Sequence, residues 1–292
     1  MQSERDIQKL IALIKEQGLE TKDEIKNFMK SMEGKSLDEL PKKRGAKNQA
    51  QDLVYDAYEQ SPAQGKKLVK KALELDPNNA DAYVYLASLE SDIEKAMALF
   101  EKAIRAGKES LGEKFFEEER GHFWGMMESR PYMRAMAGLA DCLVAKDETD
   151  KAIEIYEELL ALNPRDNQGI RYSLSSLLLG KTDLSKFQHF IKTWEKENCA
   201  VWNYNAALYQ FKKTGVTTLS ERELAKAFKQ NRFVPDYLLG IKKLPKALPE
   251  YIGRGDENEA VAYVNSSWEI WRNTKGALEW LYSFKAKGMK KQ

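Results

Sequence analysis

The chain has 292 residues, 32% charged and 42% hydrophobic, which is enough apolar material for a core beneath a polar surface. Its 47 basic and 45 acidic residues leave a net charge of +2, which excludes a strong overall attraction to nucleic acid or acidic membranes. Only two cysteines occur, so a disulfide framework is excluded and a reducing, cytoplasmic compartment is favoured. The N-terminus lacks the apolar run of a signal peptide, and no apolar run approaches the roughly 20 residues of a membrane span. We therefore expect a cytoplasmic protein with no membrane partner.

Residues 1–45 are predicted to form a helical N-terminal subdomain. Apolar residues recur at helical spacing over residues 3–16. Capping boxes at 21–24 (TKDE) and 36–39 (SLDE) predict two further short helices, and residues 42–45 (KKRG) form a basic hinge. A helix-turn-helix reader of nucleic acid is an alternative for this region, although its basic residues are mixed with acidic ones.

The clearest pattern in the chain is a pair of amphipathic helices on either side of a polar turn at 146–150. The small residues Ala140 and Ala152 allow the two helices to approach closely, and Asn163-Pro164 ends the second helix because proline cannot continue it. The whole unit, 133–166, spans 34 residues, which is the period of tetratricopeptide repeats.

Weaker versions of the same pattern flank this unit. Helix pairs are predicted at 48–77, 81–106, 167–197 and 201–228. In two of them the second helix is expected to begin at a capping box, Ser91-x-x-Glu94 in one and Ser220-x-x-Glu223 in the other. We therefore predict an all-α fold in which residues 46–232 form a tetratricopeptide-like, right-handed helical-repeat solenoid of about five helix pairs.

Residues 233–292 change in character and are predicted to form a helical C-terminal cap. A short helix is expected at 234–240, prolines at 245 and 249 break regular structure, and helices are expected at 256–272 and 276–284. A solenoid needs such a cap because its last repeat would otherwise expose an apolar face.

An aromatic insert at 107–131 interrupts the repeats. Its aromatic residues are expected to fold back onto the solenoid, and its polar residues are candidates for contacts within the insert or between repeats. These candidates are Arg120, His122, Trp124, Glu128, Arg130, Tyr132 and Asn167.

Catalytic and cofactor motifs are missing from the sequence. No phosphate-binding glycine loop and no nucleophile elbow occurs, and the two histidines, His122 and His189, lack the spacing of a zinc site. We predict no catalytic residue, no metal ligand and no cofactor, and keep an unrecognised enzyme site in the 107–131 insert as an alternative.

Arg134 and Arg171 are the leading candidates for ligand recognition. Stacked repeats place them on the first helices of consecutive helix pairs, which line the concave face of such a solenoid. Gln168, Asn203 and Asn205 are predicted on or near the same face. Guanidinium forks and amides suit carboxylates and peptide backbones, so we expect a peptide-binding site for an acidic or carboxylate-bearing segment. The alternative is that Arg130 and Arg171 pair with Glu128 or Asp166 and only tie repeats together.

Several local motifs resemble those of bacterial tetratricopeptide proteins related to the suppression-of-tumorigenicity-seven family. The matching stretches are 120–125 (RGHFWG), 130–134 (RPYMR), 162–172 (LNPRDNQGIRY), 234–240 (VPDYLLG), 254–256 (RGD) and 259–263 (EAVAY). The resemblance covers about 48–282 and implies a helical-repeat fold with an interaction role and no enzyme activity. The eukaryotic relatives are membrane-associated, and this chain departs from them in lacking a membrane segment.

The function predicted from the sequence is a non-catalytic adaptor that binds a protein or peptide through a concave solenoid face. The alternative is a nucleic-acid-binding helical-repeat protein that uses the lysine-rich patches at 42–44, 66–71 and 285–291. The near-neutral charge balance disfavours nucleic acid as the partner.

Overall fold

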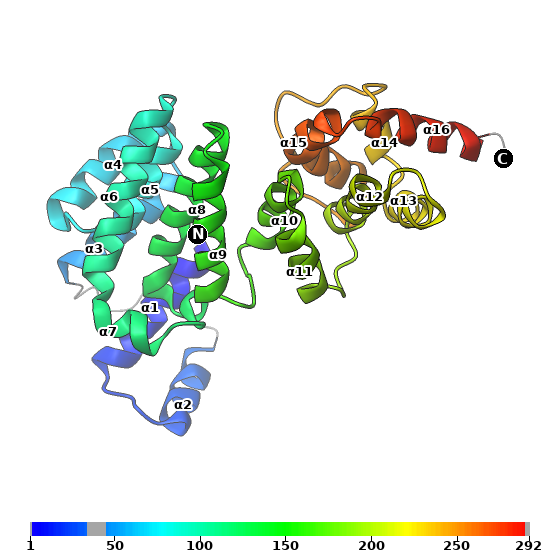
Figure 1. The fold of residues 1–292 in the computed structure, drawn as a ribbon. Helices are drawn as coiled ribbons and strands as arrows, with labels where there is room; N and C mark the ends of the chain where they lie inside the picture. The colour runs from blue at the N-terminus through cyan, green and yellow to red at the C-terminus, as the bar shows by residue number, and fades with distance from the viewer. Residues whose placement is uncertain (1, 34–44, 290–292) are drawn as a thin grey trace. The chain divides into compact units, whose positions relative to one another are not determined.

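The computed structural model describes residues 2–33 and 45–289 and divides the chain into two compact units, Met1–Asn167 (unit 1) and Gln168–Gln292 (unit 2) (Figure 1). All regular secondary structure in the described residues is helical, which confirms the predicted all-α class. The division falls inside the stretch 46–232, and the sequence boundaries at 45 and 232 remain predictions. Residues 34–44, with the expected capping box at 36–39 and the basic hinge residues before Gly45, lie outside the described residues.

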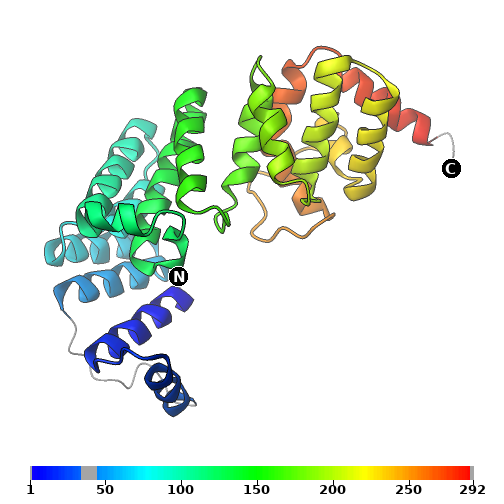
Figure 2. The same ribbon diagram turned by 60° about the horizontal axis from the view of Figure 1, so that its bottom comes forward.

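Unit 1 contains an N-terminal helical pair, three repeat-like helix pairs and the insert. Its helices are α1 (Gln2–Glu16), α2 (Lys22–Met32), α3 (Ala46–Tyr58), α4 (Pro62–Leu75), α5 (Ala80–Ser88), α6 (Ile93–Leu111), α7 (Glu113–Glu118), α8 (Arg130–Ala145) and α9 (Thr149–Leu162), with 3₁₀ turns η2 (Phe123–Gly125) and η3 (Met127–Ser129). The predicted pairs are present as α3/α4, α5/α6 and α8/α9. The first helices of the pairs are neighbours, since α5 contacts both α3 and α8. Figure 2 shows α1 beside this stack of helices.

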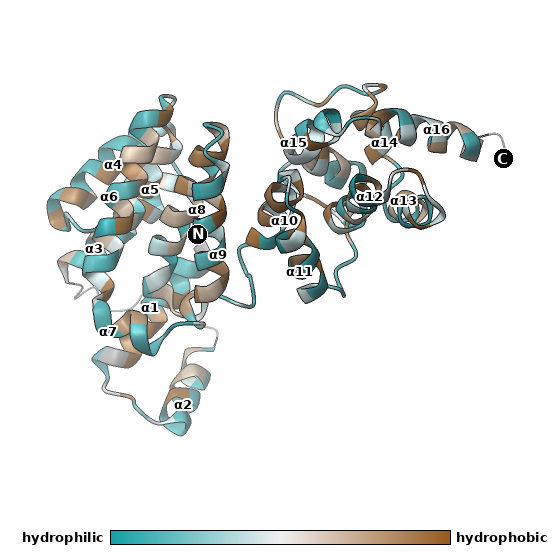
Figure 3. Ribbon diagram, viewed as in Figure 1, coloured by the Kyte–Doolittle hydropathy of each residue, from teal (hydrophilic) through white to brown (hydrophobic). Residues whose placement is uncertain are grey.

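Small residues set the spacing of these helices. Ala140 and Ala152 are 0% exposed, as the repeat pattern requires. Gly138 of α8 lies against the ring of Phe100 of α6, and a Cβ at this position would clash with that ring. Each repeat helix carries both hydrophobic and hydrophilic residues (Figure 3), as expected of helices that bury one face.

The insert folds back onto unit 1, as its aromatic residues predicted. Phe123 is 0% exposed and lies 5.1 Å from Phe116, ring centroid to centroid, and Phe116 lies 5.1 Å from Tyr132. However, α6 continues to Leu111, so the departure from the repeat begins later than residue 107. The start of α6 also differs from the prediction: its N-cap is Asp92, which accepts hydrogen bonds from two backbone N–H groups, and not Ser91.

Unit 2 contains two helix pairs followed by the C-terminal helices. Its helices are α10 (Ile170–Gly180), α11 (Ser185–Thr193), α12 (Ala200–Thr214), α13 (Thr218–Gln230), α14 (Val234–Leu238), α15 (Glu257–Asn273) and α16 (Ala277–Met289). α15 packs on both α10 and α12, where Tyr204, Tyr263 and Trp271 form a buried aromatic core. The expected start of α13 at Ser220 is wrong, because Thr217 is the N-cap and Ser220 occupies the N3 position of its capping box.

Candidate functional site

Arg134 of α8 is held by a buried carboxylate of α5. Its Nε and Nη2 donate to Asp81 Oδ1 and Oδ2 at 3.0 and 2.7 Å, and Asp81 is 0% exposed. Gln51 of α3 donates a further bond of 2.9 Å to Asp81, so the first helices of three consecutive pairs meet at this carboxylate. Burial alone would lower the pKa of Arg134, but the carboxylates of Asp81 and Glu4 outweigh it and raise that pKa, so the residue remains a cation.

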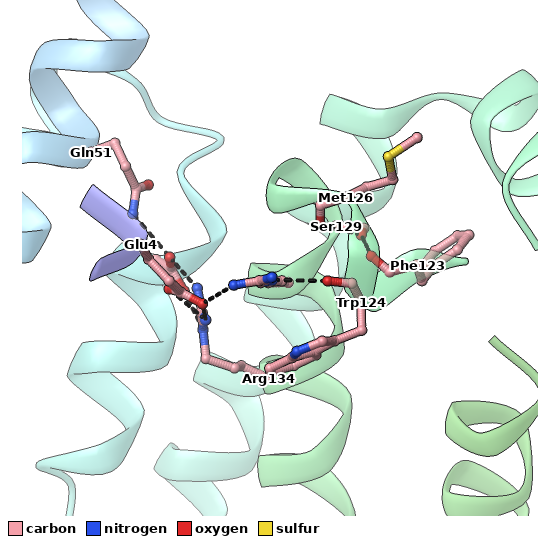
Figure 4. Close-up of polar contacts among 9 residues, drawn as sticks. Glu4, Gln51, Phe123, Trp124, Met126, Ser129 and Arg134 are labelled. Carbon is pink, nitrogen blue, oxygen red and sulfur yellow. Dashed lines mark hydrogen bonds and ion pairs between the residues drawn. The ribbon is translucent and has the colours of Figure 1, made fainter. Parts of the chain in front are cut away.

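Arg130 lies one turn before Arg134 on the same face of α8, and the insert holds it. Its Nε donates to the carbonyl of Trp124 at 2.9 Å, and its guanidinium lies 5.1 Å from the centroid of the Trp124 ring. The hydroxyl of Ser129, which is 0% exposed, donates to the carbonyls of Phe123 and Met126 and fixes the two 3₁₀ turns around Trp124 (Figure 4). The insert thus holds the Nε edge of Arg130 and leaves Nη1 directed towards α1.

Both arginines direct their Nη1 atoms to the carboxylate of Glu4 on α1. Arg130 Nη1 lies 2.9 Å from Oε1, and Arg134 Nη1 lies 3.1 and 3.0 Å from Oε1 and Oε2. Figure 4 shows Glu4 meeting Arg134, with Gln51 close by and directed to Asp81. Burial raises the pKa of Glu4, but the two arginines outweigh it, and the net effect lowers that pKa below its usual range.

Arg5, the residue after Glu4, pairs with α3, whereas Glu4 pairs with α8. Arg5 pairs with two carboxylates of α3, Asp56 at 2.7 Å and Asp52 at 3.5 Å. We call the space filled by α1 the α1 groove: its basic wall is Arg130 and Arg134 on α8, and its acidic wall is Asp52 and Asp56 on α3. A cavity of about 290 Å³ adjoins this groove. Its lining includes Gln8 and Ile11 of α1 together with Asn48, Gln51, Asn79 and Glu128.

The peptide-binding candidates of unit 2 lie in a separate setting. Arg171 pairs with Glu197 at 3.1 Å, donates to the Tyr172 hydroxyl at 2.6 Å, and lies 4.3 and 4.8 Å from the ring centroids of Tyr172 and Trp194. Gln168 is half-buried before α10. Arg134 and Arg171 therefore belong to different units, and each is held by carboxylates of its own unit.

The two asparagines differ in exposure. Asn203 is half-buried and donates to Asn198 and to the carbonyl of Cys199, both at 3.0 Å. Asn205 is 0% exposed, donates to Ser175 and accepts from the Tyr263 hydroxyl. Asn205 thus satisfies polar groups of the core, and its assignment to a peptide-contacting surface is wrong because no side-chain surface is open to a ligand.

The other candidates from the insert and the repeat boundary are exposed, except for Tyr132. Arg120 is exposed and forms a two-fold hydrogen bond with Glu158 of α9, at 2.8 and 2.7 Å, which ties the insert to the repeat. Tyr132 is buried, whereas His122, Glu128 and Asn167 are exposed. The predicted alternative that Arg130 pairs with Glu128 is wrong, because its carboxylate partner is Glu4.

Six residues of the α1 groove and its surroundings were not expected from the sequence: Glu4, Arg5, Gln51, Asp52, Asp56 and Asp81. Asp81 carries a weak signal, since an acidic residue in the first turn of a helix is favoured by the helix dipole, but that role would leave it exposed. Glu4 is 126 residues from Arg130, and no periodic pattern links the two.

Across residues 2–33 and 45–289, no group of three or more histidine, cysteine, aspartate or glutamate residues is arranged to hold a metal ion. None of the helices in that same portion combines the length and hydropathy required to cross a membrane.

Comparison with protein families decides the nature of the repeat in unit 1. Residues 134–166 match the family model described as a tetratricopeptide repeat. The chain contains a tetratricopeptide repeat. The match covers α8 from Arg134 onwards and all of α9, so the tetratricopeptide repeat itself supplies one arginine of the α1 groove. Comparison with curated proteins gives no match.

Proposed function

We propose that this chain is a non-catalytic, cytoplasmic adaptor that binds a protein or peptide, and that the face formed by α3, α5 and α8 is its docking surface. Tetratricopeptide repeats generally mediate protein–protein interaction, and the tetratricopeptide match in unit 1 supports this role. We also propose that the chain is related to the suppression-of-tumorigenicity-seven family. Such a relationship implies an interaction role.

The observation that carries the proposal is the arrangement of Arg130 and Arg134. Each is fixed by a group of the repeats or the insert, and each presents Nη1 to the same carboxylate. Two guanidinium groups converging on one carboxylate form short, charge-assisted hydrogen bonds with demanding geometry. We therefore propose an acidic partner segment for this surface. Arg171, Gln168 and Asn203 are proposed as a second set of contacts, in unit 2.

The test compares partner affinity with folding stability in the same variants. Purified chain is used to capture partners, and the affinity of each identified partner is then measured for Arg134→Ala and Arg171→Ala. Loss of a hot-spot arginine costs about 2 kcal/mol or more, or roughly thirtyfold in affinity. Arg105→Ala is the matched control, because Arg105 is an exposed arginine of α6 and its loss changes the net charge equally.

Melting temperatures of the same variants complete the test. A lowered melting temperature with unchanged partner affinity would assign the arginines to stability alone and contradict the proposed site. Failure to capture any partner reproducibly would count against the adaptor function as a whole.

A further inference from the structure

The α1 groove is complementary to a specific pair of consecutive residues. Glu4 contacts the basic wall and Arg5 contacts the acidic wall. We infer that α1 is an exchangeable internal occupant of this groove, and that the partner is an α-helix which presents an acidic residue followed directly by an arginine and takes the place of Glu4 and Arg5. This inference rests on the proposed function, because an internal occupant can compete only on a surface that binds a partner.

The groove keeps its basic wall when α1 is absent. Asp81 holds Nε and Nη2 of Arg134, and the Trp124 carbonyl holds Nε of Arg130. Neither contact involves α1, and both leave Nη1 as the donor for an incoming carboxylate. The departure of α1 therefore exposes two oriented guanidinium groups without leaving either arginine unsupported, which is the state a receptor needs before binding.

α1 itself is held differently from the repeat helices. Among its described side chains, Leu13 is the one apolar residue that is buried, whereas Ile7 is 43% exposed. The following helix, α2, buries no residue. By contrast, α3 buries four residues, Ala50, Val54, Tyr55 and Ala57. Leu10, Ile11 and Ile14 of α1 are only partly buried. Since apolar burial supplies most of the free energy that fixes a helix, α1 can leave at a smaller cost than α3.

The two walls also define the partner. A helix with only a carboxylate would satisfy Arg130 and Arg134 but would not replace the two ion pairs that Arg5 now makes with α3. An arginine can contact both aspartates with its planar fork, whereas lysine offers a single charged centre. The order of the two charges along the helix also fixes the direction in which the partner lies in the groove.

The experiment uses the full chain and a synthetic, fluorescein-labelled peptide of residues 2–20. The opened chain carries Glu4→Gln and Arg5→Gln, which together leave the net charge unchanged. Fluorescence anisotropy should show that the peptide binds this chain at least tenfold more tightly than it binds the wild type, because a tethered α1 competes at an effective concentration on the order of millimolar. The control chain, Glu20→Gln with Lys22→Gln, alters two exposed residues with the same charge balance and should behave as wild type.

Two further variants locate the contact. A peptide carrying Glu4→Gln should bind the opened chain at least tenfold more weakly than the wild-type peptide, and this comparison leaves the receptor unaltered. Adding Arg130→Gln to the opened chain should reduce peptide binding similarly, whereas adding Arg105→Gln should not. Equal binding of the two peptides, or no binding to an opened chain whose circular dichroism is unchanged, would overturn the inference.

The outcomes separate this inference from the adaptor function. Peptide binding to the opened chain, together with no partner captured by it, would contradict the adaptor function while α1 exchange stands. No peptide binding, together with a captured partner whose affinity depends on Arg134, would overturn the exchange and retain the adaptor. A wild-type dimer in sedimentation that Glu4→Gln abolishes would assign the groove to a second copy of this chain and overturn the partner helix.

Discussion

The carboxylate of Asp81 lies wholly inside unit 1 and receives two hydrogen bonds from the guanidinium of Arg134. This fork joins α5 to α8, the helix on which the tetratricopeptide match begins. Because Asp81 binds Nε and Nη2, Nη1 of Arg134 remains to donate to another carboxylate, which is Glu4 in this structure. One buried ion pair therefore serves both the packing of the repeats and the geometry of the α1 groove.

Asp81→Asn tests the structural part of this arrangement. The amide keeps the size of the side chain but removes the charge that compensates a largely buried guanidinium. Breaking a buried pair from one side typically costs about 3–5 kcal/mol, and the lower end applies here because Glu4 still pairs with Arg134. We expect a loss of about 3 kcal/mol in urea denaturation, with faster hydrogen exchange in α5 and α8.

Two controls accompany this variant. Glu101→Gln removes an exposed carboxylate of α6 and should change stability by less than about 0.5 kcal/mol. Replacing both members of the pair, as Asp81→Leu with Arg134→Met, should recover part of the loss because neither member is left as an unpaired buried charge. If Asp81→Asn is as stable as the wild type, the Asp81–Arg134 pair contributes nothing to the stability of unit 1.

The contact between Glu4 and the two arginines should depend on pH. The pKa of Glu4 lies below its ordinary value of 4.5, because the arginines outweigh the opposing effect of burial. A carboxyl group whose pKa is lower in the folded state contributes stability that is fully present above pH 4.5 and is lost as the pH falls through the folded pKa. The difference in unfolding free energy between wild type and Glu4→Gln should therefore shrink below pH 4.5 and stay constant between pH 6 and 7. A difference independent of pH from 7 to 3 would contradict this assignment.

Local periodicity accounts for the part of the fold that the sequence predicted. Ala140 and Ala152 were expected at close helix contacts, and both are completely buried. The Asn163-Pro164 stop was expected to end the second helix of the unit, and α9 ends at Leu162. Such features are encoded within a few residues of one another, so a single sequence suffices to find them.

The site depends on contacts that periodicity does not encode. Glu4 and Arg130 are 126 residues apart, and the α1 groove exists only after α1, α3 and α8 are placed together. Asn205 is the reverse case, because periodicity did encode its position. It lies three residues after Trp202 and four before Tyr209, on the buried stripe of α12, so the helical spacing already indicated a core position. The register of Asn205 on α12, and not its polar chemistry, determines that it is buried.

Arg171→Lys should weaken unit 2 even though it keeps the charge. The guanidinium lies against the rings of Tyr172 and Trp194 and pairs with Glu197. Lysine cannot stack as a plane or form the same fork, so we expect a loss of about 1–2 kcal/mol in chemical denaturation. Arg222→Lys, at an arginine that is 64% exposed, is the matched control in the same unit. Equal stability of the two variants would show that stacking does not contribute.

The last prediction concerns Glu259 of α15, a residue with 7% exposure in unit 2. Its carboxylate accepts hydrogen bonds from the backbone N–H groups of Ala200 and Gly255 at 3.0 and 2.8 Å, and from the side-chain amides of Asn231 and Gln230. Glu259 thus joins the start of α12, the end of α13 and the loop before α15. Glu259→Gln should cost about 2–3 kcal/mol in urea denaturation, because the new amide nitrogen faces donors and leaves them unpaired.

Hydrogen exchange identifies where this loss occurs. Faster exchange is expected at the N–H groups of Ala200 and Gly255, which lose their acceptor, while unit 1 should be unaffected. Glu269→Gln is the matched control on the same helix, since Glu269 is 61% exposed and its pair with Arg272 is worth less than about 1 kcal/mol. If both variants melt at the same temperature, the hydrogen bonds from these four groups to Glu259 do not hold α12, α13 and α15 together, and the aromatic core of unit 2 must do so alone.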